Sequence, residues 1–134
     1  MSDAVHDEVL ALNRRLLEAI AQGDWASYEA LCDPGLTAFE PEAQGQLVEG
    51  LEFHRFYFRL GGARGPNHTT MCAPQVRLLG DVAVVAYVRL NLRVGPDGRA
   101  SVTAFEETRV WHKQPAGWRH VHFHRSSAVP RNNS

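Results

Sequence analysis

Hydrophobic positions in the first part of the chain repeat at helical spacing. They predict an amphipathic helix over residues 5–22 and, after a break, a short helix over residues 25–31. Gly23 suits the left-handed position that ends a helix, and Asp24 is a suitable N-cap for the next one. The chain is therefore expected to begin with two helices joined by a tight turn.

Turn-forming residues and short apolar runs alternate in the next stretch. The run 33–35 (Asp-Pro-Gly) should end the second helix, and residues 36–40 have the pattern of a short strand. A loop follows, and after Gly50 we predict a third helix that ends at the glycine-rich run 61–66. The aromatic residues of this helix form one stripe, which we expect to pack in the core or between subunits: Phe53, Phe56 and Tyr57.

The remainder of the chain is rich in strands. Helices followed by consecutive strands indicate an α+β fold, with the helices on one face of a curved antiparallel sheet. The 134 residues suit a single domain over 1–134, with a frayed tail over 128–134. Turn residues separate the four predicted strands, which span 67–79, 82–94, 100–113 and 117–127.

The predicted strand over 82–94 is apolar on both of its faces. Every second residue from Val82 onward is apolar, and the opposite face is apolar as far as Tyr87. Such a strand needs cover on both sides, whereas the helices cover only one side. We therefore expect the other face to contact a second copy of the chain, through positions that include Val84, Val88, Leu90 and Leu92.

Composition and charge restrict the classes of partner. The formal net charge is -1, which gives no electrostatic reason to expect nucleic acid or an anionic membrane. No apolar run approaches the ~20 residues of a membrane span, and the polar start is unlike a signal peptide, so we expect a cytoplasmic domain. Cys32 and Cys72 lack metal-binding spacing and are expected to be small apolar residues in a reducing compartment. We expect neither a metal nor a cofactor.

Three arginines lie in segments that otherwise suit the interior of a sheet: Arg89, Arg109 and Arg125. A guanidinium cannot be neutralised in a protein, so removing it from water requires acceptors. Three guanidiniums on converging strands predict either a pocket that holds an anion or a network of internal ion pairs. In the second arrangement the partners would be Glu107, Glu106 or Glu40.

Several motifs along the chain are long and unusual. FHRFYF at 53–58, EETRVWH at 106–112 and VHFHRS at 121–126 resemble, in this order, the association (hub) domain of calcium/calmodulin-dependent protein kinase II. The match covers nearly the whole chain. It implies an NTF2-like fold, a cone in which a curved sheet wraps around a long N-terminal helix. It also implies a ring-like homo-oligomer of roughly a dozen subunits. The chain has no Gly-rich ATP loop, so it is similar to the hub without the kinase.

The same resemblance implies a pocket that accepts small carboxylates. An arginine offers a planar fork of donors that engages a carboxylate bidentately, and a neighbouring imidazole or phenol can bind an adjacent hydroxyl. The residues that match the family's pocket are His54, Arg89, Arg109 and Arg125, with Tyr28 and Glu107 beside them.

Catalysis is the competing class of function. NTF2-like cones also hold isomerases, dehydratases and polyketide cyclases, which place an acid or a histidine in the cavity as general base. The candidates in this chain would be His54, Glu107 and Tyr28. Nearby arginines would lower the pKa of a carboxylate and weaken it as a base, so we assign no catalytic residue.

Three histidines alternate along the last predicted strand: His120, His122 and His124. On a regular strand all three lie on one face, where an H-x-H pair can chelate zinc. The family resemblance supplies no metal, so we expect this face to be solvated or to lie in an interface.

Overall fold

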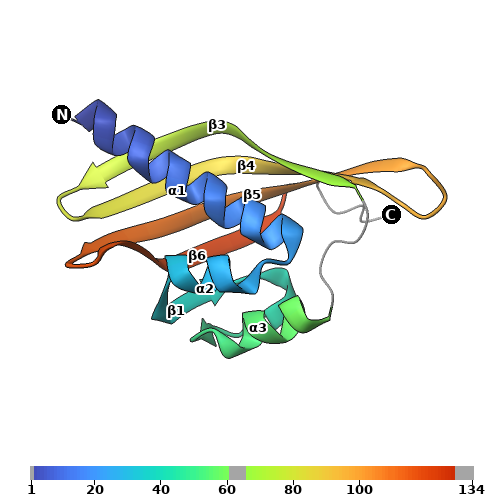
Figure 1. Ribbon diagram of the computed structural model, residues 1–134, viewed down its shortest axis with the longest axis horizontal. Helices are drawn as coiled ribbons and strands as arrows, with labels where there is room; N and C mark the ends of the chain where they lie inside the picture. The colour runs from blue at the N-terminus through green and yellow to red at the C-terminus, as the bar shows by residue number, and fades with distance from the viewer. Residues whose placement is uncertain (1, 61–65, 129–134) are drawn as a thin grey trace.

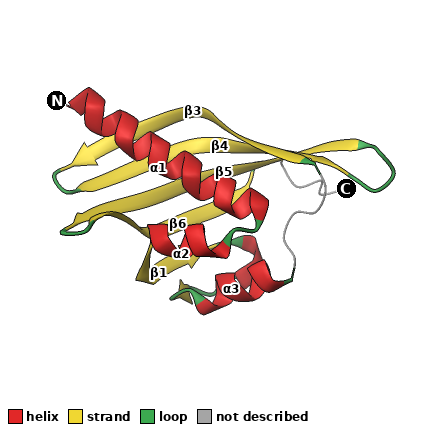
Figure 2. Ribbon diagram, viewed as in Figure 1, coloured by secondary structure: helices red, strands yellow, loops and turns green. Residues whose placement is uncertain are grey.

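Helices and sheet form two layers in the computed structural model, which describes residues 2–60 and 66–128. The helices α1 and α2 lie across one face of a six-stranded sheet with the order β2-β1-β6-β5-β4-β3, and α3 lies beside α2 (Figures 1 and 2). The elements are α1 (Ser2–Gln22), α2 (Trp25–Leu31), β1 (Cys32–Phe39), the 3-10 helix η1 (Pro41–Ala43), β2 (Val48–Glu49), α3 (Glu52–Arg59), β3 (Asn67–Leu79), β4 (Val82–Val94), β5 (Ala100–Gln114) and β6 (Gly117–Ser127).

The four long strands lie where the sequence predicts them, and β5 is one residue longer than expected. Differences occur earlier in the chain. The strand β1 begins at Cys32, four residues before the predicted start, because Cys32 already pairs with His120 of β6. The predicted loop after β1 contains η1 and β2. The glycines at 61, 62 and 65, which we expected to end the third helix, lie outside the described residues.

One strand pairing departs from the antiparallel sheet that we predicted. The strands β3 to β6 form an antiparallel meander, as expected, but β1 runs parallel to β6. A parallel pair needs a long connection, and here the rest of the chain between β1 and β6 supplies it. This pairing brings the segment after β1 next to the end of β6, and both segments contribute residues to the site described below.

The first two helices have the predicted boundary. Gly23 adopts a left-handed conformation with φ of 68°, which a glycine accepts without steric cost. The Asp24 carboxylate caps α2 by accepting hydrogen bonds from the Ser27 backbone N–H at 3.1 Å and the Ser27 hydroxyl at 2.6 Å. Among the described residues, no helix is both long enough and apolar enough to cross a bilayer.

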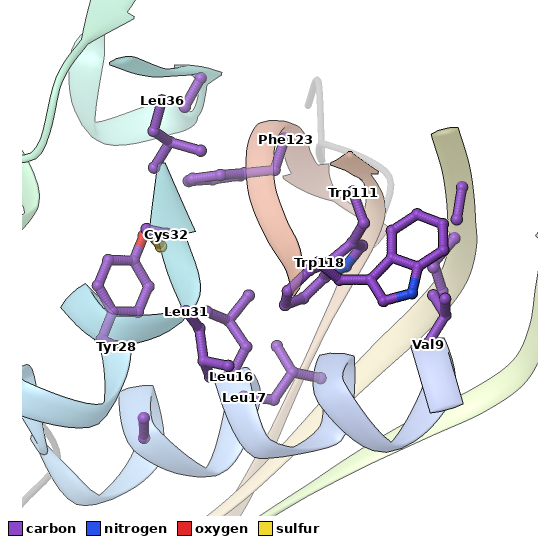
Figure 3. Close-up of a cluster of buried hydrophobic side chains, with 14 of the residues drawn as sticks. Val9, Leu16, Leu17, Tyr28, Leu31, Cys32, Leu36, Trp111, Trp118 and Phe123 are labelled. Carbon is purple, nitrogen blue, oxygen red and sulfur yellow. The ribbon is translucent and has the colours of Figure 1, made fainter. Parts of the chain in front are cut away.

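The core lies between α1 and the sheet. Figure 3 shows Trp111 and Trp118, from β5 and β6, close to Val9, Leu16 and Leu17 of α1. Both indoles are buried, and the Trp111 ring N–H donates to the Asn13 side-chain oxygen at 3.0 Å. Burying large aromatic groups with their polar atoms satisfied anchors α1 on this half of the sheet. The other half of the covered face remains open as a cavity.

Candidate functional site

A cavity of about 500 Å³ lies between the sheet and the helices, within the size range of small-molecule sites. One wall comes from β4, β5 and β6, and the facing wall comes from the three α-helices and the segment around η1. The sheet wall consists of Arg89, Asn91, Arg93, Ser101, Thr103, Phe105, Arg109, Phe123 and Arg125. The facing wall consists of Ile20, Tyr28, Glu40, Glu42, His54, Tyr57 and Phe58.

A buried ion-pair network lies at the inner end of the sheet wall. Glu107 accepts from the Arg89 guanidinium at 3.1 Å and from the Arg109 guanidinium at 3.0 Å. The Tyr87 hydroxyl donates to the same carboxylate at 2.6 Å and accepts from Arg109 Nε at 2.9 Å. The Arg109 guanidinium also lies 4.3 Å above the centre of the Phe123 ring. Two guanidiniums therefore share one carboxylate, and all three charged side chains are buried.

Burial and the neighbouring charges shift the pKa of the Glu107 carboxyl in opposite directions. Burial alone would raise the pKa of the Glu107 carboxyl, but the charges of Arg109 and Arg89 and the Tyr87 hydrogen bond lower that pKa to about 2. Burial raises the pKa of the Tyr87 phenol to about 12. Glu107 is therefore ionised and Tyr87 is neutral at any physiological pH.

A second ion-pair network lies near the end of β6. The Arg125 guanidinium donates to both oxygens of Glu42 and lies 3.7 Å from Glu40. Its face covers the Phe105 ring at 4.6 Å from the ring centre. Glu40 also contacts His54 Nε2 at 2.6 Å. The parallel pairing of β1 with β6 makes this network possible, because it places the segment after β1 beside Arg125.

His54 is a buried polar group with one unsatisfied atom. Its Nε2 is bound to Glu40, whereas its buried Nδ1 has no hydrogen-bond partner among the described residues. Tyr28 and Phe123 lie beside the imidazole, with ring centres 5.9 Å and 5.4 Å away. A buried nitrogen without a partner is costly.

The structure brings the predicted pocket residues together. Tyr28, His54, Arg89, Arg109 and Arg125 line the cavity, and Glu107 lies behind the wall, where it holds two of the arginines. Of the two arrangements that the sequence left open, the structure contains the network of internal ion pairs, and this network borders an open cavity. Of the carboxylates considered as partners, Glu107 and Glu40 contact arginines, and Glu106 is exposed on the other face of the sheet.

Sequence reasoning missed several residues of the lining. Asn91 and Arg93 follow Arg89 at alternate positions of one strand, so a signal for them was present, since alternate residues share a face. Glu42 had no comparable signal. It comes from η1, in a stretch predicted as loop, and reaches Arg125 only through the parallel β1–β6 pairing.

The three alternating histidines do not share a face, contrary to the prediction. A register shift between Val110 and Trp111 places His120 opposite Trp111 in the core, where its ring stacks on Phe123. His122 and His124 instead contact Phe39, on the uncovered face of the sheet. The extra residue of a bulge reverses the alternation of side chains, which a strict two-residue period does not anticipate.

The surroundings of His120 keep it neutral. Burial and the nearby Arg109 charge hold the pKa of its imidazole well below the usual value. Its Nδ1 lies 3.5 Å from the Cys32 thiol, whose own pKa is raised to about 12 by burial. In the described part of the chain, no group of three or more histidine, cysteine, aspartate or glutamate side chains is arranged to hold a metal ion.

A second candidate surface lies on the sheet face opposite the helices. We call it the outer face and define it by Val84, Ala86, Val88, Leu90 and Leu92 of β4 with Val102, Ala104 and Val110 of β5. Leu92 pairs with Val102, and their side chains are 41% and 61% exposed. No described helix crosses this face (Figure 1). The intervening β4 residues Ala83, Val85 and Tyr87 are buried on the covered face, so β4 has the two-sided character that its sequence indicates.

The aromatic stripe of α3 is divided between the core and the surface. Phe53 packs against the core, whereas Phe56 is 57% exposed in the single chain. Tyr57 lines the cavity and packs against Phe53 with the two rings tilted and their centres 5.0 Å apart. Packing within one subunit therefore accounts for only part of the stripe.

Comparison with known proteins gives a consistent set of relatives. The family model of the calcium/calmodulin dependent protein kinase II association domain matches residues 5–129. The delta subunit of calcium/calmodulin-dependent protein kinase type II from Oryctolagus cuniculus is 48% identical over 124 residues, which is 90% of this chain and 23% of that protein. The chain thus spans about a quarter of the length of this relative.

Solved structures agree with these relatives. The CaMKII hub homology domain of Chlamydomonas reinhardtii is 48% identical with a TM-score of 0.86, covering 93% of this chain and 99% of that one. The association domain of C. elegans CaMKII is 44% identical with a TM-score of 0.88, covering 93% and 97%. An NTF2-like superfamily protein from Salmonella enterica, 23% identical, has a TM-score of 0.80 and covers 99% and 97%. The predicted NTF2-like α+β fold is confirmed.

Proposed function

Because this chain belongs to the calcium/calmodulin-dependent protein kinase II association domain family, we propose that it self-associates into a ring-like homo-oligomer. The observation that supports the proposal most is the apolar outer face. Leu92 and Val102 are largely exposed there, and no described segment covers them. Contiguous exposed apolar surface of this kind is typical of contacts between subunits.

The surroundings of the outer face suit a contact between copies of the chain. On one side it is flanked by polar residues of β3, where Arg77 pairs with Val84 and Thr70 pairs with Leu90. On the β5 side, Thr108 and Glu106 lie opposite Ala86 and Val88, between the apolar residues Ala104 and Val110. An apolar centre with a polar rim is the usual composition of a stable interface, which buries more than ~1,000 Å² in total.

Native mass tests the proposal. We expect light scattering after size exclusion to find one stable species of about ten or more subunits over a wide range of protein concentrations. A mass that falls to that of a monomer on dilution would contradict an obligate assembly. A stable dimer would retain a role for the outer face but exclude the ring.

We propose in addition that the cavity binds small carboxylates. Two features support this role: a sheet wall with four guanidiniums and a cavity volume of about 500 Å³. Guanidiniums bind carboxylates with directed hydrogen bonds, and a partly enclosed site strengthens such bonds relative to water.

Removing a guanidinium from the wall tests this second role. We expect Arg89→Ala to weaken the binding of 5-hydroxypentanoate about tenfold, because it removes one positive charge and leaves Glu107 with a single arginine partner. Ligand-observed NMR titration measures the dissociation constant. Arg99→Ala is the matched control, since Arg99 is exposed and lies outside the cavity lining. Equal affinity of Arg89→Ala and the parent would argue against the arginine wall.

The geometry does not favour the catalytic alternative. Glu107 has a pKa of about 2 and both of its oxygens are hydrogen-bonded, so it is a weak base. Burial raises the pKa of the Tyr28 phenol well above its usual value, which leaves it neutral. The arginines that suit the cavity to an anion are thus the groups that make its buried carboxylate a poor proton acceptor.

A further inference from the structure

Among the described residues around the cavity, one guanidinium has no counter-charge. Arg89 and Arg109 are bound to Glu107, and Arg125 is bound to Glu42 and Glu40, so three guanidiniums face three carboxylates. The formal charges of these three guanidiniums and three carboxylates cancel. Arg93 is the fourth guanidinium of the lining, and no described side chain is hydrogen-bonded or ion-paired to it. Among the described arginines and carboxylates around the cavity, the net positive charge is therefore that of Arg93.

Polar donors surround Arg93 on the sheet wall. Asn91 lies two residues before Arg93, on the same face of β4, and Ser101 and Thr103 of β5 lie opposite Arg93 and Asn91. The Asn91 side-chain oxygen accepts from Arg89 Nε at 3.2 Å, which leaves its amide N–H groups without an acceptor among the described residues. One guanidinium, one amide and two hydroxyls thus gather at one end of the cavity, and all four residues line it.

The guanidiniums at the two ends of the sheet wall differ in whether a protein carboxylate already binds them, and this affects how a ligand carboxylate would bind. At the inner end it would compete with Glu107 for guanidiniums that are already hydrogen-bonded at 3.0 to 3.1 Å. At Arg93 it would meet a guanidinium with no hydrogen-bond or ion-pair partner among the described side chains. Breaking a buried pair costs several kcal/mol, whereas an exposed arginine needs only to lose part of its hydration.

Resting on the proposed carboxylate-binding role, we propose that Arg93 is the residue that anchors the ligand's carboxylate, with Asn91, Ser101 and Thr103 as further donors. The remainder of the ligand then extends along Phe105 and Tyr57 toward the inner part of the cavity. Because the inner charges cancel, a second carboxylate would lose its water without gaining a counter-charge. The cavity therefore selects ligands with a single negative charge.

Two five-carbon probes with different charge test this assignment. 5-Hydroxypentanoate carries one carboxylate and glutarate carries two, and their dissociation constants are measured by ligand-observed NMR titration with the full chain. We expect the parent to bind 5-hydroxypentanoate about tenfold more tightly than glutarate. We expect Arg93→Ala to weaken 5-hydroxypentanoate binding about tenfold. Arg93→Lys should retain most of the affinity, because lysine keeps the positive charge although it lacks the paired N–H donors of the guanidinium.

The control and the other outcomes separate this assignment from the proposed function. Arg99→Ala removes the same charge from an exposed position of the β4–β5 hairpin and should bind like the parent. If the parent binds 5-hydroxypentanoate and Arg93→Ala binds it equally well, the assignment to Arg93 is wrong and the carboxylate-binding role stands. Equal or tighter binding of glutarate by the parent would overturn the selection of single charges. If the parent binds neither probe, the carboxylate-binding role itself is wrong, and the assignment with it.

Discussion

Glu107→Gln is expected to lower the melting temperature by more than about 10 °C. Glu107 is the carboxylate shared by Arg89 and Arg109, and all three residues are at least 94% buried. Glutamine has nearly the same shape but carries no charge, so two guanidiniums would be left in the interior without a counter-ion. Removing one partner of a buried ion pair costs about 3–5 kcal/mol.

The control for this experiment is the same substitution at an exposed carboxylate. Glu29 lies on the surface of α2, and Glu29→Gln should change the melting temperature by less than about 2 °C. Both variants are compared with the parent by circular dichroism at one protein concentration, because assembly makes stability depend on concentration. A melting temperature of Glu107→Gln close to that of the parent would mean that water reaches the network and that the arginines are not desolvated as the structure indicates.

The same carboxylate predicts the direction of a pH effect. Its pKa of about 2 in the folded protein lies below the 4.5 of a free glutamate side chain, so the unfolded chain binds a proton first as the pH falls. The stability that Glu107 contributes is therefore fully present above about pH 4.5 and is lost between pH 4.5 and pH 2. Part of the acid sensitivity of the parent should be absent from Glu107→Gln.

Much of the fold is predictable because the strands carry strong local signals. Gly80 and the glycine-containing turn at 95–98 separate runs of alternating residues, which is why the bounds of β3 and β4 match the prediction. The arginines of the site are also predictable, since guanidiniums within apolar strands require internal partners. For Arg89 and Arg109 the partner Glu107 was among the carboxylates named from the sequence.

Other features depend on contacts between distant segments. The parallel pairing of β1 with β6 and the position of Glu42 beside Arg125 join residues 83 to 88 positions apart, and no local pattern specifies them. The bulge opposite Trp111 turns His120 into the core, and no residue near it has the usual signature of a bulge. Arg93 lies on the same face of β4 as Arg89, as strand alternation predicts, but only the pairing of the other arginines shows that, within the described cavity lining, Arg93 is the guanidinium without a partner.

Leu90→Glu is expected to break the assembly into smaller species or to prevent folding. Leu90 lies in the middle of the outer face, between Thr70 of β3 and Ala104 of β5, with no basic side chain directly opposite. A carboxylate in the centre of an apolar contact would be desolvated without a partner, at a cost of several kcal/mol in every subunit that makes the contact. Val88→Glu should act in the same direction and more strongly, because Val88 pairs with Glu106 and the two like charges would repel.

Ala11→Glu is the matched control for Leu90→Glu. Ala11 is exposed on α1, which lies on the other side of the sheet, and glutamate is a good helix former, so this variant adds the same charge away from the outer face. We expect it to keep the parent's mass in light scattering, while Leu90→Glu loses it. Circular dichroism of Leu90→Glu then distinguishes a folded smaller species from an unfolded chain. If Leu90→Glu kept the parent's mass, the outer face would not be a subunit contact, since a buried carboxylate at this position is incompatible with a closely packed apolar interface.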